Sequence, residues 1–137
     1  MTLKNSFMLF VAACLCAGSA KGEPQRTITV GQARALVMAS LLPEQRALPK
    51  VEADEYPSPK PSHFLFFTVT WEGTPSGSVV VGNYAVDRYT GDVWSATSSC
   101  EEETNKILRA LQAKVRATLH LSRSHYHEIK TKGPLCD

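Results

Sequence analysis

Cys100 is the residue of this chain best placed to act as a nucleophile. It precedes the acidic run Glu101–Glu103, which is typical of a helix N-terminus, and the positive end of a helix dipole lowers the pKa of a thiol. Three histidines follow in the sequence, and one of them could serve as the general base of this thiol. They are His120, His125 and His127. A thiol-dependent enzyme is therefore one hypothesis for this protein.

The cysteine count favours a different role for Cys100. Of the four cysteines, Cys14 and Cys16 lie in an apolar N-terminal stretch, which is removed if it is an export signal. The remaining pair is Cys100 and Cys136, and an even pair in an oxidising compartment indicates a disulfide. The bond would close a loop of about 37 residues and contribute roughly 3–4 kcal/mol on the chain-entropy model. We therefore expect a Cys100–Cys136 disulfide.

Two other groups of residues have types that could carry chemistry. His125 and His127 would point about 200° apart on a helix, so we do not expect them to bind a metal together. Asp87 and Asp92 flank a tight turn, where aspartate is ordinary, and a glycosidase-like carboxylate pair needs a cleft larger than we expect of so small a domain. The sequence has no glycine-rich phosphate loop, no G-x-S-x-G and no H-E-x-x-H. We expect no metal, no cofactor and no catalytic residue.

The N-terminus has the layout of a cleavable export signal. Lys4 supplies a positive charge, residues 7–17 (FMLFVAACLCA) are an unbroken apolar run, and residues 18–20 (GSA) are small. Cleavage after Ala20 and cleavage after Gly22 both fit the small-x-small rule. The run is too short to span a bilayer, which takes about 20 apolar residues. We expect an exported protein, periplasmic or secreted, with no transmembrane segment after cleavage.

Anchoring by a lipid is the alternative for this segment. Residues 11–14 (VAAC) resemble a bacterial lipobox, in which Cys14 would become the lipidated first residue. The apolar stretch before Cys14 is short, and the apolar run continues past it. These two features favour the ordinary signal.

Charge narrows the classes of partner. Removal of residues 1–22 leaves one domain at 23–137 and takes away Lys4 and Lys21, so that 13 of the 15 basic side chains face 13 acidic ones. A formally neutral chain is not expected to bind nucleic acid or a membrane surface. Residues 104–137 nevertheless hold many more bases than acids, and such a face could meet an acidic partner. The bases are Lys106, Arg109, Lys114, Arg116, Arg123, Lys130 and Lys132, against Glu128 and Asp137.

Hydrophobic periodicity and turn residues predict an α+β domain. Helices are expected at 30–42, 100–119 and 123–130, and strands at 63–71, 78–87 and 93–97. Residues 43–63 contain five prolines and are expected to form a proline-rich loop, partly extended. The expected fold is a three-stranded antiparallel meander packed by an N-terminal helix and a long C-terminal helix, plus a short final helix.

Capping signals mark the expected helix starts. Thr29 and Gln32 have capping-box spacing before the first helix. Ser98 and Ser99 have the same spacing to the acids that follow them, and Ser122 precedes the final helix.

The clearest hairpin covers residues 84–94 (YAVDRYTGDVW), in which Gly91 can take the positive φ of a tight turn. This segment resembles the V-D-x-x-T-G-x-V hairpin of PepSY-type domains, and the likeness covers about half of the mature chain. The matching residues are Val86, Asp87, Thr90, Gly91 and Val93. The resemblance implies a helix on an antiparallel sheet and a usually non-catalytic protein that holds or inhibits an extracytoplasmic partner. The long final helix and the cysteine pair depart from that pattern.

Arg88 and Tyr89 lie at the centre of this hairpin turn, where a tyrosine is hard to bury. An exposed Arg-Tyr pair is typical of a binding hot spot, so these two are the expected partner-binding residues. The first hypothesis is an exported, non-enzymatic binding module, such as an inhibitor or immunity protein, that acts on an extracytoplasmic protein. Small exported immunity proteins have a similar general look. The alternatives are the thiol-dependent enzyme using Cys100 with a histidine, and a structural envelope protein.

Overall fold

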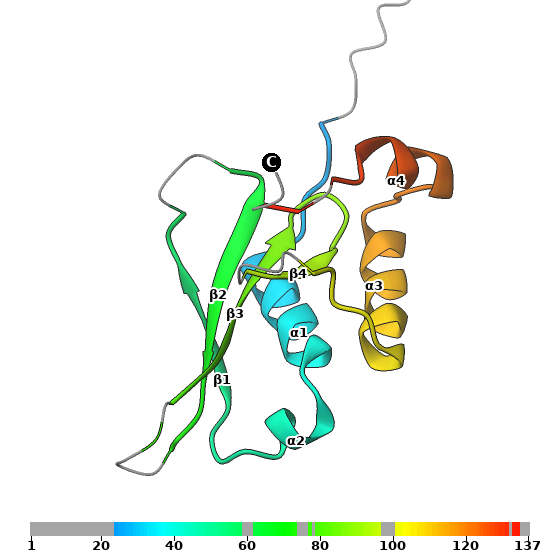
Figure 1. Cartoon of the computed structure of the whole chain (residues 1–137). Helices are drawn as coiled ribbons and strands as arrows, with labels where there is room; N and C mark the ends of the chain where they lie inside the picture. Colours follow the sequence, from blue (N-terminus) through cyan, green and yellow to red (C-terminus); the bar gives the residue numbers. More distant parts are fainter. Residues whose placement is uncertain are drawn as a thin grey trace, which may run out of the picture.

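The structure is a computed structural model that describes residues 24–58, 62–73, 77, 79–96, 101–131 and 133–134. Its four strands form one antiparallel sheet in the order β1-β2-β3-β4. The elements in chain order are α1 (Val30–Ser40), α2 (Pro43–Arg46), β1 (Glu52–Tyr56), β2 (Phe64–Thr70), β3 (Val80–Asp87), β4 (Val93–Ser95), α3 (Lys106–Thr118) and α4 (Arg123–Ile129). The expected α+β class is confirmed (Figure 1).

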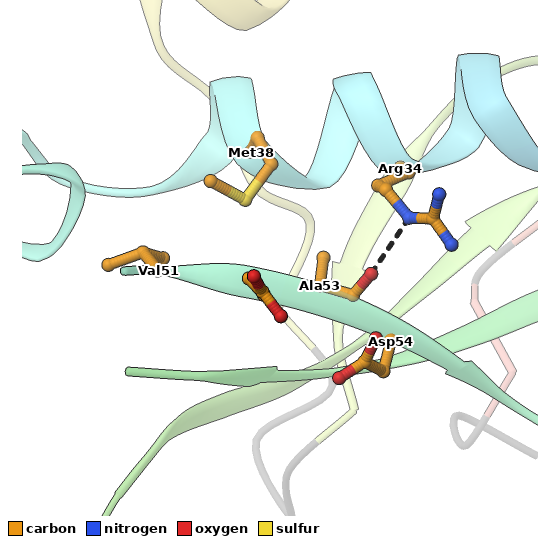
Figure 2. Close-up of a pocket in the computed structure, with 6 residues that line it drawn as sticks. Arg34, Met38, Val51, Ala53 and Asp54 are labelled. Carbon is orange, nitrogen blue, oxygen red and sulfur yellow. Dashed lines mark hydrogen bonds between the residues drawn. The ribbon is translucent and has the colours of Figure 1, made fainter. Parts of the chain in front are cut away.

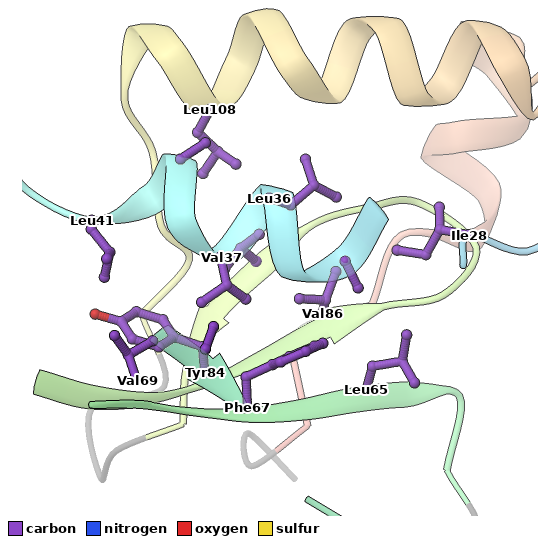
Figure 3. Packing of buried hydrophobic residues seen from close by; sticks show 14 of the residues in the cluster. Ile28, Leu36, Val37, Leu41, Leu65, Phe67, Val69, Tyr84, Val86 and Leu108 are labelled. Atoms are coloured by element: carbon purple, nitrogen blue, oxygen red, sulfur yellow. The ribbon is translucent and has the colours of Figure 1, made fainter. Parts of the chain in front are cut away.

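Helix α1 is the central layer, because it lies between the sheet and α3 (Figure 3). Its Ala33, Leu36 and Val37 are fully buried, as expected of a helix covered on two sides. The predicted capping box is present: the Thr29 hydroxyl accepts from the Gln32 N–H at 3.1 Å, and the Gln32 side chain accepts from the Thr29 N–H at 2.9 Å. Leu108 of α3 reaches into the same core.

The β2–β3–β4 meander is confirmed, with each strand shorter than expected by one to two residues at an end. Alternation along β2 places Leu65, Phe67 and Val69 on the core side. Phe64, on the other face, joins a second cluster with Ala85 and Trp94. The sheet is therefore apolar on both faces near β4.

The prediction of a proline-rich, partly extended loop at 43–63 is wrong over α2 and β1, and the expected three strands are four. The segment contains α2, in which Pro43 occupies the first turn, and β1, which pairs along its length with β2. Glu52, Asp54 and Glu55 have low strand propensity, and Ala53 is the buried residue of β1. Pairing with β2 therefore determines the conformation of this segment.

The predicted start of the long helix is also wrong, because α3 begins at Lys106 rather than near residue 100. Residues 101–103 instead run beside β4, where the Ser95 N–H donates to Glu101 O at 2.8 Å and the Glu103 N–H donates to Val93 O at 2.8 Å. The helix cap is Asn105, whose side chain accepts from the Leu108 N–H at 2.8 Å. The proposed caps at residues 98 and 99 lie outside the described residues.

The final helix is confirmed as α4, with Ser122 as its cap. Ser122 Oγ accepts from the His125 N–H at 3.2 Å. No helix within the described part of the chain is both long and apolar enough to cross a membrane.

Candidate binding site at the β3–β4 turn

The turn between β3 and β4 is shaped by Asp87. Its Oδ1 accepts from the Tyr89 N–H at 2.8 Å and from the Thr90 N–H at 3.2 Å. The Gly91 N–H donates to Asp87 O at 2.9 Å, and Gly91 has a φ of 71°. Glycine adopts this left-handed conformation without a steric penalty. The hairpin read from the sequence is therefore present, with its aspartate as the turn acceptor.

Neighbouring segments fix the backbone of the turn from three sides. The Arg88 N–H donates to His63 O at 3.0 Å, and Arg88 O accepts from the Ile28 N–H at 2.9 Å. From α3, Gln112 Nε2 donates to Gly91 O at 3.0 Å. The position of Arg88 is thus set by the chain before β2 and by the chain before α1.

Asp92 links the turn to α3 and α4. Its side chain is 2% exposed, and its Oδ1 accepts from Arg116 Nη2 at 2.6 Å. The Tyr126 hydroxyl donates to the same carboxylate at 3.1 and 3.2 Å, and Arg116 Nε donates to Thr90 O at 2.8 Å. The Arg116 guanidinium lies 4.2 Å from the centre of the Tyr126 ring. Burial and the charge of Asp92 raise the pKa of Tyr126, which keeps its hydroxyl protonated as a donor.

Asp87 is the second buried carboxylate of the turn. Burial raises its pKa, against the opposing effects of its backbone N–H donors and of His63. His63 Nε2 lies 3.6 Å from Asp87 Oδ2, and the Thr131 hydroxyl donates to Oδ2 at 3.4 Å. Both carboxylates that the sequence placed at this turn are therefore engaged by groups of the fold. They brace the turn rather than line a cleft.

The two expected partner-binding residues lie on the outer side of the turn. Arg88 is exposed, and Tyr89 is half-buried. The Tyr89 ring stacks on His63, with 5.9 Å between ring centroids. The tyrosine is therefore held by a neighbour more firmly than the sequence suggested, while Arg88 remains presented to solvent.

The structure says less about the cysteines and histidines that the sequence offers as candidate site residues. Cys100 and Cys136 lie outside the described residues, so their pairing stays a prediction. His125 and His127 are both on α4, where His125 Nδ1 lies 3.3 Å from Glu128 Oε2 and His127 lies edge-on to Tyr126. No group of three histidine, cysteine or acidic side chains suited to a metal occurs among the residues that the structure describes.

Surface grooves lie on either side of the core among the described residues. One, of about 320 Å³, lies between α1 and β1, with Arg34 and Met38 above Val51 and Ala53 (Figure 2). Arg34 Nε donates to Ala53 O at 2.9 Å and so occupies a backbone acceptor of β1. The other, of about 330 Å³, lies between α3 and α4. Its lining residues are Ala113, Arg116, Leu121, Ser122, Arg123, Tyr126 and His127.

Sequence reasoning missed Arg116, Tyr126 and His63 as parts of this site. Arg116 and Tyr126 lie 24 and 34 positions from Asp92 in the chain. No local spacing rule links residues so far apart. The sequence offered one indication of these residues. Asp87 and Asp92 flank the turn, and an aspartate that is buried there needs a hydrogen-bond donor from another part of the fold.

Comparison with known proteins gives one informative likeness. No protein-family model and no curated protein matches the chain. A chain of a solved structure does match, and that structure is described as a type VI secretion system effector-immunity complex from Pseudomonas protegens. The match has a TM-score of 0.57 and 26% sequence identity, and it covers 74% of this chain and 85% of the other. The chain is thus similar, over most of its length, to one chain of an effector-immunity complex.

Proposed function

We propose that this protein is an exported, non-enzymatic binding module that neutralises a protein partner, as an immunity protein does. The observation that carries the proposal is the likeness to a chain of an effector-immunity complex over 74% of this sequence. Its α+β fold and modest size suit an inhibitor that acts by covering a surface of its partner.

The chemistry of the β3–β4 turn supports binding over catalysis. A catalytic carboxylate must reach substrate, whereas Asp87 and Asp92 are 1% and 2% exposed and accept hydrogen bonds from the fold itself. The hydrogen bonds of Asp87 and Asp92 make the turn rigid, and the Arg88 side chain is exposed on it. A rigid binding loop loses little conformational entropy on association, and arginine and tyrosine are frequent hot-spot residues.

The compartment belongs to the same proposal. The N-terminal signal layout favours export to the periplasm or beyond, where a Cys100–Cys136 disulfide would persist. The partner is then an extracytoplasmic protein, such as a toxin that acts in the cell envelope.

The test is capture followed by inhibition. Tagged residues 23–137 are exposed to envelope extract under non-reducing conditions, and bound proteins are identified by mass spectrometry. The purified partner is then titrated with the protein while its own enzymatic or toxic activity is followed. We expect the activity to fall to a plateau at a fixed molar ratio. A partner whose activity is unchanged at saturation, or the absence of a stoichiometric partner, would contradict the proposal.

The turn is tested with Tyr89→Ala. The substitution keeps the backbone N–H that bonds Asp87 and removes the ring that stacks on His63. We expect at least a tenfold weaker affinity for the captured partner, measured by calorimetry, and a melting temperature within a few degrees of wild type. Lys50→Ala, at an exposed cation far from the turn in the sequence, is the control and should bind normally. Loss of folding in Tyr89→Ala would show that the ring is structural.

A further inference from the structure

We infer that the outer face of α3 and α4 is the surface on which an acidic segment of the protein partner docks, with the groove between the two helices receiving a carboxylate side chain. This inference rests on the proposed function and adds the chemistry of the partner. The surface is called the basic face, and it is defined by Lys106, Arg109, Lys114, Arg123 and the groove residues Ala113, Arg116 and Tyr126.

Most of the positive charge of this face is uncompensated, because among its cations only Arg116 is ion-paired within the described structure, with Asp92. Four of its cations, Lys106, Arg109, Lys114 and Arg123, are exposed and form no ion pair with any described residue. Helix α3 contains no acidic residue, and α4 contains only Glu128, which faces His125. Exposed cations that outnumber the acids of their own helices give a positive potential that attracts an acidic surface and steers its approach.

Helical geometry gathers these charges on one side of α3. At 100° per residue, Lys106, Arg109 and Arg116 fall within about 80° of one another, and Lys114 lies about 80° to the other side of Lys106, so the cations of α3 span about 160° of its surface. The opposite side of the helix faces the core through Leu108, Gln112 and Val115. The exposed side thus runs straight into the groove, where the small side chain of Ala113 leaves room above the helix.

Arg116 gives the groove a pre-positioned donor. Its side chain is 24% exposed, its Nε bonds Thr90 O, and its Nη2 bonds Asp92. A guanidinium has five N–H donors in a rigid plane, so three remain for an incoming group. Tyr126 supports the plane from one side at 4.2 Å. An arginine already held in this way loses little side-chain entropy when a carboxylate binds.

The basic face also contains apolar residues, as protein interfaces do. At 100° per residue, Ala110 and Ala117 lie between the cations on the exposed side of α3, and Ile107, which is 54% exposed, lies at the edge of that side. Apolar residues surrounded by charged ones are the usual composition of a protein-binding patch. This favours a folded protein surface over a nucleic acid or a lipid headgroup as the occupant.

The opposite end of the molecule has the opposite charge. In β1, Glu52, Asp54 and Glu55 are exposed, and β1 lies on the left of Figure 1 while α3 and α4 lie on the right. A domain whose charge is divided in this way would turn its basic face toward an acidic partner and its β1 edge away from it.

The first test uses a probe that does not require the partner. Pentaglutamate is titrated into isotopically labelled residues 23–137, and amide chemical shifts are followed by NMR. We expect shifts concentrated in α3 and α4, saturating in the millimolar range and lost in Arg109→Glu/Arg123→Glu. Both substitutions place an acid in the first turn of a helix, where the dipole favours it, so folding should be kept. Shifts spread evenly over the surface, or absent at α3 and α4, would overturn the inference.

The second test uses the captured partner. We expect Arg109→Glu/Arg123→Glu to slow association at least tenfold and to flatten its salt dependence, measured by surface plasmon resonance. Arg46→Glu/Lys50→Glu makes the same change in net charge near α2 and should bind like wild type. If both double variants associate like wild type while the partner is still inhibited, the basic face is wrong and the proposed function stands. If no protein partner binds, but a DNA oligonucleotide or anionic vesicles bind and lose binding in Arg109→Glu/Arg123→Glu, then protein docking is wrong and the face serves that ligand.

Discussion

Replacing Arg116 by methionine should be the most damaging single change at the turn. The substitution keeps the length of the side chain and removes the guanidinium from Asp92, whose carboxylate is 2% exposed. Breaking a buried pair by removing one partner typically costs about 3–5 kcal/mol, because the other charge stays buried. The contact with the Tyr126 ring is also lost.

The contacts of Asp92 and Arg116 narrow the expected loss in the free energy of unfolding. The Tyr126 hydroxyl still donates to Asp92, which offsets part of the loss, and Arg116 is not fully buried in the wild type. We therefore expect Arg116→Met to lower the free energy of unfolding by about 3 kcal/mol. A domain of this size has a total stability of about 5–15 kcal/mol, so the loss is a large share.

Urea unfolding followed by tryptophan fluorescence measures this loss, with the m-value checked for a two-state transition. Lys114→Met, two positions away on the exposed side of α3, is the matched control and should change stability by no more than about 0.5 kcal/mol. In the double variant Asp92→Asn/Arg116→Met the uncompensated charge is gone, so the double loss should be smaller than the sum of the single losses by about 2 kcal/mol. A loss below about 1 kcal/mol for Arg116→Met, or strict additivity, would refute the view that this pair braces the turn.

Three further predictions concern the turn and the cysteines. Gly91→Ala places a Cβ at a φ of 71°, 3.3 Å from a Leu36 methyl group, and should cost about 1–2 kcal/mol, seen as a lower melting temperature; an unchanged value would show that the turn relaxes freely. Because burial raises the pKa of Asp87, the folded protein binds this proton more tightly than the unfolded chain does. The stability of wild type relative to Asp87→Asn should therefore be greatest below pH 4 and decline as pH rises through the folded-state pKa, and denaturant titrations that show the opposite slope would contradict this cause. Mass spectrometry after alkylation without reductant should find Cys100 and Cys136 unmodified, and reduction should cost roughly 3–4 kcal/mol; a labelled Cys100 in the native protein would favour the thiol-enzyme hypothesis instead.

Short-range sequence patterns correctly predicted the elements whose conformation depends on residues close together in the chain. Thr29 with Gln32, and Ser122 before α4, cap their helices as the spacing predicts, since a cap depends on residues three positions apart. The β2–β3–β4 meander followed from alternation and from Gly91 in the turn. In each of these elements the residues that decide the conformation are close together in the chain.

Structure set by distant partners could not be predicted in the same way. Strand β1 has one buried residue, Ala53, and forms because β2 offers an unpaired edge. Glu101–Glu103 looks like a helix start, but its backbone groups bond β4 instead. The candidate site has the same origin, because Asp92 meets Arg116 and Tyr126 only after α3 and α4 have packed.

At the β3–β4 turn, the groups that stabilise the backbone differ from the side chain that is exposed for binding. Both backbone groups of Arg88 are bonded, to His63 and Ile28, while its side chain is exposed and lies outside the buried ion pair of Asp92 and Arg116. A side chain can therefore be exchanged at this position without a change in the groups that hold the turn. Under the proposed function, this arrangement would allow specificity to change through the side chain at position 88 and the cations of the basic face, while the buried carboxylates keep the backbone in place.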